Sequence, residues 1–356
     1  MGHPSIENLT PFTFEPLFLA DEEMRPLLVP VVKATFELTP QGKLSLAEEQ
    51  APLEVAGKKW EDSDESSDRY EPEGAFFKPA TDVVLVGHAH AQERGAREAL
   101  VALKIGALQK GVRVIGDRVW FKSMGSITMT KPAPFERIPL RYERSFGGWD
   151  RSNPDATKHQ FEPRNPVGTG FRASGSRFEE GVRLPNLEDP TQLLKEWGDR
   201  PTPTGFGFTS PHWHPRAAFA GTYDAAWEKS RKPLLPRDFD RRFLNAASPG
   251  LIASGYLQGN EPVVVANATP EGRLTFNLPG IPPPRVQVSR EDQPDAWLEL
   301  KLDTVILDTD VMRLFLLWRS PLVLKREPLE VRAIRVHPGT SPEVSRRPSG
   351  TLRAVR

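Results

Sequence analysis

A stretch of more than one hundred residues near the middle of the chain constrains the fold most strongly. From residue 142 to residue 260, glycine, proline, asparagine and aromatic residues appear with little periodicity. Such a sequence predicts loops, with neither a long amphipathic helix nor a regular sheet, and loops of this length in an ordered domain usually carry a function. The aromatic content argues against disorder. We therefore expect rigid loops that form a surface for shape recognition.

Strand patterns occupy both sides of this region and predict the rest of the fold. We expect a mainly β protein with antiparallel, sandwich-like or barrel-like sheets, a long loop region rich in glycine, proline and aromatic residues, and a few short helices. The strands at the two ends of the sequence are expected to share one sheet system. The predicted organisation is a single domain over 1–337, divided into strand group 1–141, loop region 142–260 and strand group 261–337, followed by a flexible basic tail at 338–356.

The N-terminal strand group contains four local signals. Residues 27–38 are rich in β-branched side chains and end at the turn signal 39–42, which predicts a hairpin with residues 43–46. Residues 61–73 hold seven acidic residues and predict an exposed loop. Consecutive valines in 81–90 predict a strand buried on both faces at the centre of a sheet. The Gly116-Asp117 pair within 111–121 predicts a second hairpin.

The C-terminal strand group and two short helices complete the expected elements. Residues 262–266 and 272–278 predict two strands joined by a turn, and the strict alternation over 297–303 predicts a half-buried strand. Residues 312–319 are expected to form a hairpin partner. Within the loops, Asp189 is a candidate N-cap for a helix reaching Gly198, and Asp224 is a candidate N-cap for a helix over 225–229.

Composition excludes several classes of function. Lysine plus arginine and aspartate plus glutamate both number 47, so the formal net charge is zero and gives no general attraction for nucleic acid or an anionic membrane. The chain has no cysteine, which excludes disulfides and thiol nucleophiles and is compatible with a reducing compartment. Its start lacks the pattern of a signal peptide, and its apolar runs are strand-sized. These features predict a cytoplasmic protein that binds neither nucleic acid nor membrane.

Known catalytic motifs are missing from the sequence. It has no Gly-x-Ser-x-Gly nucleophile elbow, phosphate loop, dinucleotide fingerprint or paired zinc histidines, so we expect no catalytic residue, cofactor or metal. Two His-x-His pairs, at 88–90 and 212–214, could place two imidazoles on one face of a strand, but a structural role explains both pairs better than a metal site does. The second pair lies between two prolines and is expected in a packed loop. An enzyme remains the alternative, acting on a small molecule or glycan through the neighbourhood of Asp238, Asp240, Arg241 and His214.

A series of ordered motifs over most of the chain resembles one family, the bacterial domain-of-unknown-function 2169 proteins. The matching segments are 78–83, 141–148, 165–171, 205–207, 213–216, 220–224, 235–240, 243–247 and 317–319. The resemblance implies a non-enzymatic adaptor or chaperone for type VI secretion effectors. Such a protein binds an effector, typically through a PAAR-type or related N-terminal region, and helps to load it onto the VgrG spike. The implied partners are therefore the effector and the VgrG or PAAR protein.

Two groups of residues follow from these motifs. Aromatic and arginine side chains supply most of the energy at protein interfaces. The candidate partner-binding residues are accordingly Phe206, Phe208, Trp213, Arg216, Tyr223 and Trp227. The residues expected to shape the loops are Asn165, Pro166, Gly168, Gly170, Phe171, Gly205, Gly207, Gly221, Asp224, Asp238, Asp240 and Asn245. The alternative is that the first group also holds the loop scaffold, with partner contacts made elsewhere or through an exposed strand edge.

Overall fold

The fold is built on one large, mainly antiparallel sheet that joins both ends of the sequence. The computed structural model describes residues 4–325 and 330–340. The large sheet has seven strands, in the path β2-β3-β24-β23-β7, with β4 and β25 also pairing with β3. Its strands are β2 (Thr13–Ala20), β3 (Pro26–Leu38), β4 (Leu44–Leu46), β7 (Asp82–Val86), β23 (Lys301–Asp308), β24 (Arg313–Arg319) and β25 (Leu322–Val323). Because β23 and β24 lie between β7 and β3, the first and last strand groups form a single sheet, as the sequence predicts.

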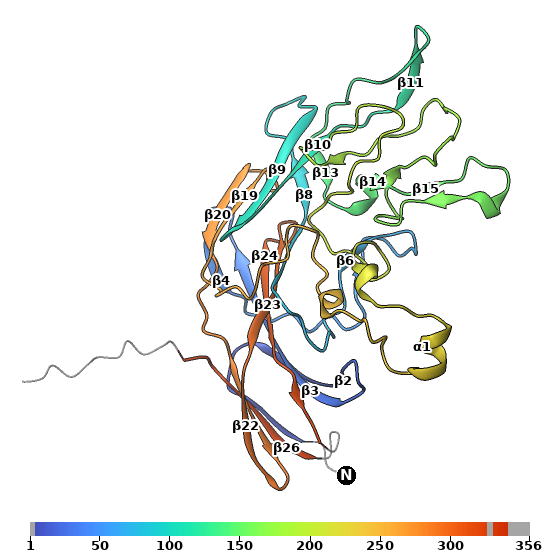
Figure 1. Ribbon diagram of the computed structural model, residues 1–356. Coiled ribbons are helices and arrows are strands. Elements are labelled where there is room, and N and C mark those ends of the chain that lie inside the picture. Colours follow the sequence, from blue (N-terminus) through green and yellow to red (C-terminus); the bar gives the residue numbers. More distant parts are fainter. Residues whose placement is uncertain (1–3, 326–329, 341–356) are drawn as a thin grey trace, which may run out of the picture.

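Two smaller sheets extend this core in opposite directions (Figure 1). A five-stranded sheet has the order β18-β10-β9-β19-β20, and a four-stranded sheet has the order β1-β26-β21-β22. The first contains β9 (Glu98–Ile105), β10 (Leu108–Ile115), β18 (Leu187–Glu188), β19 (Pro262–Ala266) and β20 (Arg273–Asn277). The second contains β1 (Ser5–Asn8), β21 (Arg285–Arg290), β22 (Gln293–Glu299) and β26 (Val331–His337). The fold is thus mainly β, and the sheets do not close into a barrel.

Short paired strands and single helical turns make up most of the remaining structure. The two-stranded pairs are β5 (Lys58–Lys59) with β6 (Asp68–Tyr70), β8 (His88–His90) with β13 (Arg137–Pro139), β11 (Trp120–Ser123) with β12 (Ser126–Met129), β14 (Phe146–Gly147) with β17 (Thr169–Gly170), and β15 (Trp149–Asp150) with β16 (Gln160–Phe161). The helical turns are η1 (Tyr142–Arg144), η2 (Ala156–Lys158), η3 (Arg216–Phe219), α1 (Ala225–Ser230) and η4 (Arg241–Leu244). None of the helices in the described ranges is both long and apolar enough to cross a membrane.

Most of the local predictions hold. The hairpin of β3 with β4, the adjacent strands β19 and β20, and the hairpin of β23 with β24 are all present. The helix over 225–229 is present as α1, and the carboxylate of Asp224 accepts a hydrogen bond from the backbone N–H of Trp227 at 2.8 Å. The predicted tail at 338–356 lies largely outside the described residues. Local turn and capping chemistry was therefore sufficient to place these elements.

The predicted hairpin at Gly116-Asp117 is wrong. Strand β10 ends at Ile115, and its antiparallel partner is β9, joined to it through Gly106. Gly116 instead sits close to another loop, where an added Cβ would lie 1.8 Å from the carbonyl oxygen of Ala133. The glycine is needed for this close approach and not for a turn.

Three other expectations are corrected by the structure. The alternation at 297–303 spans the end of β22 and the start of β23, which belong to different sheets. No helix forms over 189–198, because the carboxylates of Glu188 and Asp199 accept hydrogen bonds from backbone N–H groups there. The acidic run 61–73 is exposed only in part: it includes β6, and Glu73 is buried against Lys33 with an N–O distance of 2.8 Å.

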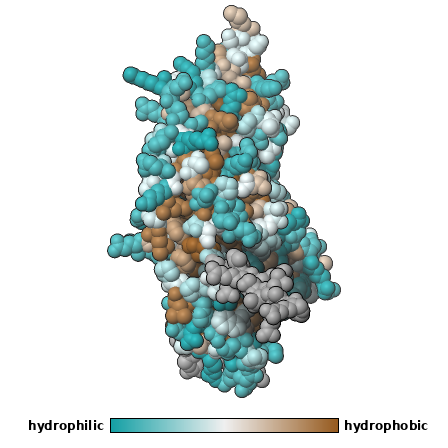
Figure 2. Space-filling model, turned by 90° about the vertical axis from the view of Figure 1, so that its left-hand side faces the viewer, coloured by the Kyte–Doolittle hydropathy of each residue, from teal (hydrophilic) through white to brown (hydrophobic). Residues whose placement is uncertain are grey.

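The apolar core follows the large sheet and continues into the two smaller ones. Strand β7 is fully buried, as predicted, but it lies at the end of the strand path and not at its centre. A second, smaller core lies apart from the first. It contains Trp120, Phe146, Phe171, Val182, Leu184 and Leu194. Figure 2 shows hydrophobic residues gathered among hydrophilic ones on the side of the molecule where β9 and β20 lie. Leu100 of β9 is 52% exposed.

Candidate functional site

The family-like motifs come together where the loops cover the free edge of β7. We call the segments 142–171, 205–216 and 220–247 the signature loops. Backbone N–H groups of β7 that no neighbouring strand uses are bound by the loop region: Val83 donates to the carbonyl of Leu251 at 2.9 Å, and Leu85 donates to that of Phe206 at 3.2 Å. The loops thus continue the sheet and are fixed to it.

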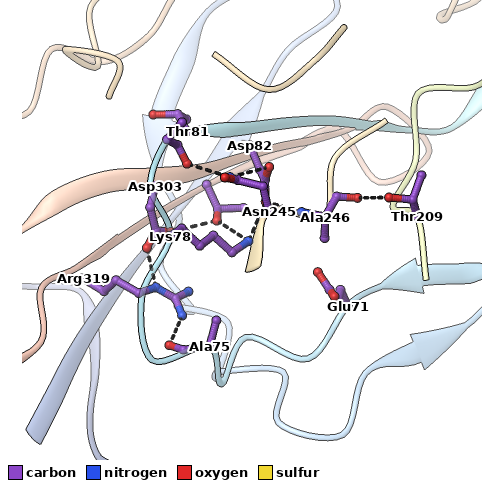
Figure 3. A network of polar contacts seen from close by, with 12 residues as sticks. Glu71, Ala75, Lys78, Thr81, Asp82, Thr209, Asn245, Ala246, Asp303 and Arg319 are labelled. Carbon is purple, nitrogen blue, oxygen red and sulfur yellow. Dashed lines mark hydrogen bonds and ion pairs between the residues drawn. The ribbon is translucent and has the colours of Figure 1, made fainter. Parts of the chain in front are cut away.

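A buried polar network holds the same loops from below (Figure 3). The Asp82 carboxylate accepts three hydrogen bonds: from Lys78 Nζ at 2.7 Å, from Asn245 Nδ2 at 2.9 Å and from the backbone N–H of Ala246 at 2.9 Å. Asp82 is completely buried and Asn245 nearly so. This one side chain of β7 therefore ties the last signature motif to the core sheet.

A second ion pair continues this network. Arg319 of β24 contacts Asp303 of β23, and both side chains are at most 2% exposed. Thr304 connects the two pairs, because its hydroxyl donates to Asp303 Oδ1 at 2.8 Å and accepts from Lys78 Nζ at 3.1 Å. Burial raises the pKa of Asp303, and the opposite charge of Arg319 counteracts this effect.

A third pair lies directly below the loops. The Arg216 guanidinium contacts the Glu71 carboxylate at 2.5 Å, and it donates to the carbonyls of Thr209 at 2.7 Å and Phe243 at 2.8 Å. Burial raises the pKa of Glu71, against the effect of Arg216. Arg216 therefore joins two backbone carbonyls of the signature loops to the buried carboxylate of Glu71.

Four of the six candidate partner-binding residues are inside the molecule. Phe206, Phe208 and Trp213 are at most 2% exposed and Arg216 is 8% exposed. The Trp213 ring packs edge-on against Tyr142 with centroids 5.3 Å apart. In this structure these side chains hold the loop scaffold, which was the alternative drawn from the sequence. They offer no surface to a partner.

The other two candidates form an exposed aromatic pair. Tyr223 is 53% exposed, and its ring packs edge-on against the half-buried Trp227 on α1 at 4.7 Å. Trp227 Nε1 donates to the carbonyl of Leu234 at 2.9 Å, and Arg231 forms an ion pair with Glu23. This pair thus lies at the start of a short helix, whose Trp227 and following residues are fixed by these contacts.

A second exposed aromatic pair lies in another signature loop and was missed from the sequence. Trp149 on β15 and Phe161 on β16 are 41% and 42% exposed, with ring centroids 4.6 Å apart. The carboxylate of Asp150 fixes the adjacent loop: it accepts from Ser152 and from the backbone N–H of Ala173. Burial alone would raise the pKa of Asp150, but these hydrogen bonds hold it well below its usual range. The Gly-Gly-Trp sequence that ends in Trp149 was the available signal.

The glycines of the motif 165–171 allow two backbones to approach closely. A Cβ on Gly168 would lie 2.7 Å from Gly147 Cα, and Gly147 has a φ of +149°. Asn165 is fully buried, and its Nδ2 donates to the carbonyls of Tyr142 at 2.8 Å and Phe146 at 3.0 Å. Only glycine fits where β14 and β17 pair in this way.

The remaining signature residues shape the other loops, with one exception. Gly170 and Gly221 have positive φ values, Gly205 packs on the Tyr142 ring, and Phe171 lies in the small core. Pro166 lines a surface hollow. We have no physical account of Gly207, which has an ordinary φ and no neighbour within 4 Å of an added Cβ.

Three neighbouring hollows, which share lining residues, lie along the signature loops. One of about 420 Å³ is lined by residues that include Trp149, Arg151 and Val167. Val167 also lines a hollow of about 320 Å³ beside His212, and Ser152 links the first hollow to a third of about 570 Å³. The surface therefore has depressions large enough to receive side chains of a protein partner.

The structure does not gather the residues of the enzyme alternative into a cavity. Asp238 accepts hydrogen bonds from Thr222, Asp240 pairs with Arg242, and Arg241 pairs with Glu22. His214 is exposed in a loop. Over residues 4–325 and 330–340, no three His, Asp or Glu side chains form a group suited to hold a metal ion.

Lys110 links the five-stranded sheet to the loop that follows the signature loops. Its Nζ donates to Ser248 Oγ at 2.6 Å and to the carbonyl of Pro249 at 2.8 Å. Burial lowers the pKa of Lys110 from 10.5 to about 8, and Asp189 partly opposes this shift. The folded protein therefore releases this proton at a lower pH than the unfolded chain does.

This shift predicts a pH dependence of stability. Between about pH 8 and 10.5 the unfolded chain binds more protons at Lys110, so stability contributed by this site is expected to rise with pH. The measurement is urea unfolding of the wild type and of Lys110→Met across this range. The free energy of unfolding of the wild type is expected to rise relative to that of Lys110→Met as the pH increases. A constant difference for Lys110→Met would contradict the prediction.

Comparison with known proteins identifies the family. The model of the family described as "Uncharacterized protein conserved in bacteria (DUF2169)" matches residues 23–319. No curated protein and no solved structure matches the chain. The matched range includes all of the signature loops and most of the large sheet. The chain therefore belongs to the DUF2169 family.

Proposed function

We propose that this protein is a non-enzymatic adaptor or chaperone for a type VI secretion effector. It binds the effector, through a PAAR-type or related N-terminal region, and assists loading onto the VgrG spike. The observation that carries the proposal is the make-up of the signature loops: they present two exposed aromatic pairs and line surface hollows, and a buried polar network anchors their last segment to the core sheet. Rigid aromatic side chains at a surface are typical of protein-binding sites.

The exposed aromatic pairs fit this role energetically. Aromatic side chains contribute large apolar contact areas and lose little conformational freedom on binding. Tyr223 and Trp149 are each supported by another ring and by a fixed loop, so little further ordering is needed when a partner binds. A partner with exposed apolar surface, such as an effector before its assembly onto a spike, is the class of protein that this surface suits.

The test is affinity purification of the full chain from a host that expresses its secretion system, followed by mass spectrometry. Enrichment of one PAAR-bearing or toxin-domain protein, together with VgrG, is the expected result. If no component of the secretion system is enriched while that system is expressed, the proposal fails.

Replacement of either Tyr223 or Trp149 by alanine is expected to weaken binding to the recovered effector by about thirtyfold, because a central aromatic contact contributes about 2 kcal/mol. The matched control is Trp297→Ala, since Trp297 is also 53% exposed but lies on β22 of the four-stranded sheet, outside the signature loops. The measurement is the dissociation constant for each variant. Equal loss in the control would show that exposed aromatic residues act without specificity.

A further inference from the structure

A hollow distinct from the three described above has a marked excess of positive charge. It measures about 620 Å³, and one of its lining residues, Leu184, belongs to the second core. Its lining residues are Asp117, Arg118, Val119, Thr130, Lys131, Ala133, Arg141, Glu143, Arg144, Thr169, Arg183, Leu184 and Asn186. Five of these side chains are cationic and two are acidic, in a chain whose formal charge is zero. We call this hollow the cationic pocket.

Three of its arginines are held in place by contacts that use only part of each guanidinium. Arg118 is buried and pairs with Glu188, while Nη2 of the same group donates to the carbonyl of Pro185 at 2.9 Å. Nη1 of Arg141 donates to Glu61 at 2.6 Å, and Nη1 of Arg144 donates to Asn186 at 3.2 Å. A guanidinium has five N–H donors, so each arginine is positioned and still has donors available.

The other two cations are free. Lys131 and Arg183 are exposed, and within the described part of the chain their side chains make neither an ion pair nor a hydrogen bond. Of the two acidic side chains, Glu143 is occupied by hydrogen bonds from Ser66 and Ser67. Asp117 is largely exposed and lies 3.6 Å from Arg144. The positive charge is therefore only partly neutralised within the protein.

We propose that the cationic pocket binds a carboxylate-rich peptide segment. Resting on the proposed function, this segment belongs to the bound effector. Arginine forks match carboxylates in geometry, and a hollow of this volume is in the range of about 300–1,000 Å³ that is usual for ligand sites. No aromatic side chain lines it, so nothing is present to stack against a nucleobase. The negative charge of Asp117 also repels a doubly charged phosphate more strongly than it repels a singly charged carboxylate.

The position of the pocket supports this choice. Arg141, Glu143, Arg144 and Thr169 lie in the same motifs whose glycines and Asn165 shape the signature loops. Two of the lining arginines, Arg141 and Arg144, lie only a few residues before Trp149 in the sequence. We therefore expect a partner that contacts Trp149 to be able to place an acidic segment in the pocket. Charge pairs at such a position increase the rate of association and select the partner.

The test is titration calorimetry of the full chain with an acetylated hexaglutamate peptide. The wild type is expected to bind the peptide, more weakly at high salt, and Lys131→Glu with Arg183→Glu is expected to reduce the affinity by about tenfold or more. Among the residues that the structure describes, these two side chains make neither an ion pair nor a hydrogen bond, so the fold is expected to tolerate their replacement. The matched control is Lys104→Glu with Arg273→Glu, which makes the same change of charge at exposed positions on β9 and β20. The control is expected to bind as the wild type does.

Inorganic phosphate and a hexalysine peptide serve as competing probes. Absence of hexaglutamate binding, equal affinity in the Lys131/Arg183 variant, or phosphate binding as tight as peptide binding would overturn the proposal. The result is separable from the proposed function. If the peptide binds but no secretion protein is recovered, the proposal for the cationic pocket is supported and the proposed adaptor function is overturned. If the Lys131/Arg183 variant recovers the effector as well as the wild type does, the adaptor function is supported, but the cationic pocket does not take part in effector binding.

Discussion

Replacement of Asp303 by alanine is expected to lower the free energy of unfolding by about 3–5 kcal/mol, because it leaves a buried arginine without its counter-charge. Arg319 is almost completely inaccessible and contacts Asp303 directly. Its other contact is a hydrogen bond from Nη1 to the carbonyl of Ala75 at 2.5 Å, which does not compensate a charge. Urea unfolding monitored by tryptophan fluorescence measures the effect.

Two further variants test whether the loss of stability arises from the unpaired charge of Arg319 or from a general loss of packing. Asp303→Leu combined with Arg319→Met removes both charges and keeps the volume similar, so it is expected to recover more than half of the lost stability. Asp295→Ala on β22 removes an exposed carboxylate with a single hydrogen bond to Gln287, and a change below about 1 kcal/mol is expected. If the double variant is no more stable than Asp303→Ala, the loss does not arise from the unpaired arginine.

The pair of Asp303 and Arg319 also shows what the sequence did not reveal. The two residues were assigned to neighbouring strands, but the alternation over 297–303 indicated a half-buried strand and gave no sign that Asp303 is completely buried. The reason is that the burial comes from loops distant in sequence, including Ala75 and Lys78. The alternation of polar and apolar residues predicts a strand, but it does not predict whether distant loops bury the polar face of that strand.

Predictions based on local chemistry were accurate, and those that needed distant partners were not. The β3–β4 hairpin and the Asp224 cap of α1 depend on residues adjacent in sequence. The turn at Gly116 and the helix at 189–198 failed because Ala133 and Glu188 offered competing contacts. Local propensity is a weak guide where tertiary contacts satisfy the backbone differently.

The same distinction between local and distant contacts applies to the candidate site. The sequence located the signature loops and their glycines, but it could not decide which aromatic residues face inward. Phe206 and Phe208 are buried because their segment runs along the edge of β7, whereas Trp149 lies exposed on the short strand β15, just after two glycines with positive φ. Apolar side chains signal burial and binding equally well in a sequence without regular periodicity.

Replacement of Asp82 by alanine is expected to have an effect on stability of similar size, about 3–5 kcal/mol, and a distinct local consequence. Lys78 loses its counter-charge, while Asn245 and the N–H of Ala246 lose their acceptor. Because Asn245 and Ala246 join the last signature loop to β7, amide hydrogen exchange is expected to accelerate in 243–247 more than in β24.

The local consequence links the buried network to partner binding. A loosened loop must be ordered again when a partner binds, so under the proposed function Asp82→Ala is expected to weaken effector binding at temperatures where the variant remains folded. Asp303→Ala serves as the matched comparison, because it removes a buried acid of the same network without a direct bond to the loops. Greater loss of binding for Asp82→Ala than for Asp303→Ala, at equal global stability, is the expected result. Equal exchange rates in 243–247 for the two variants would contradict the role assigned to Asp82, since the signature loops would then not depend on this carboxylate for their order.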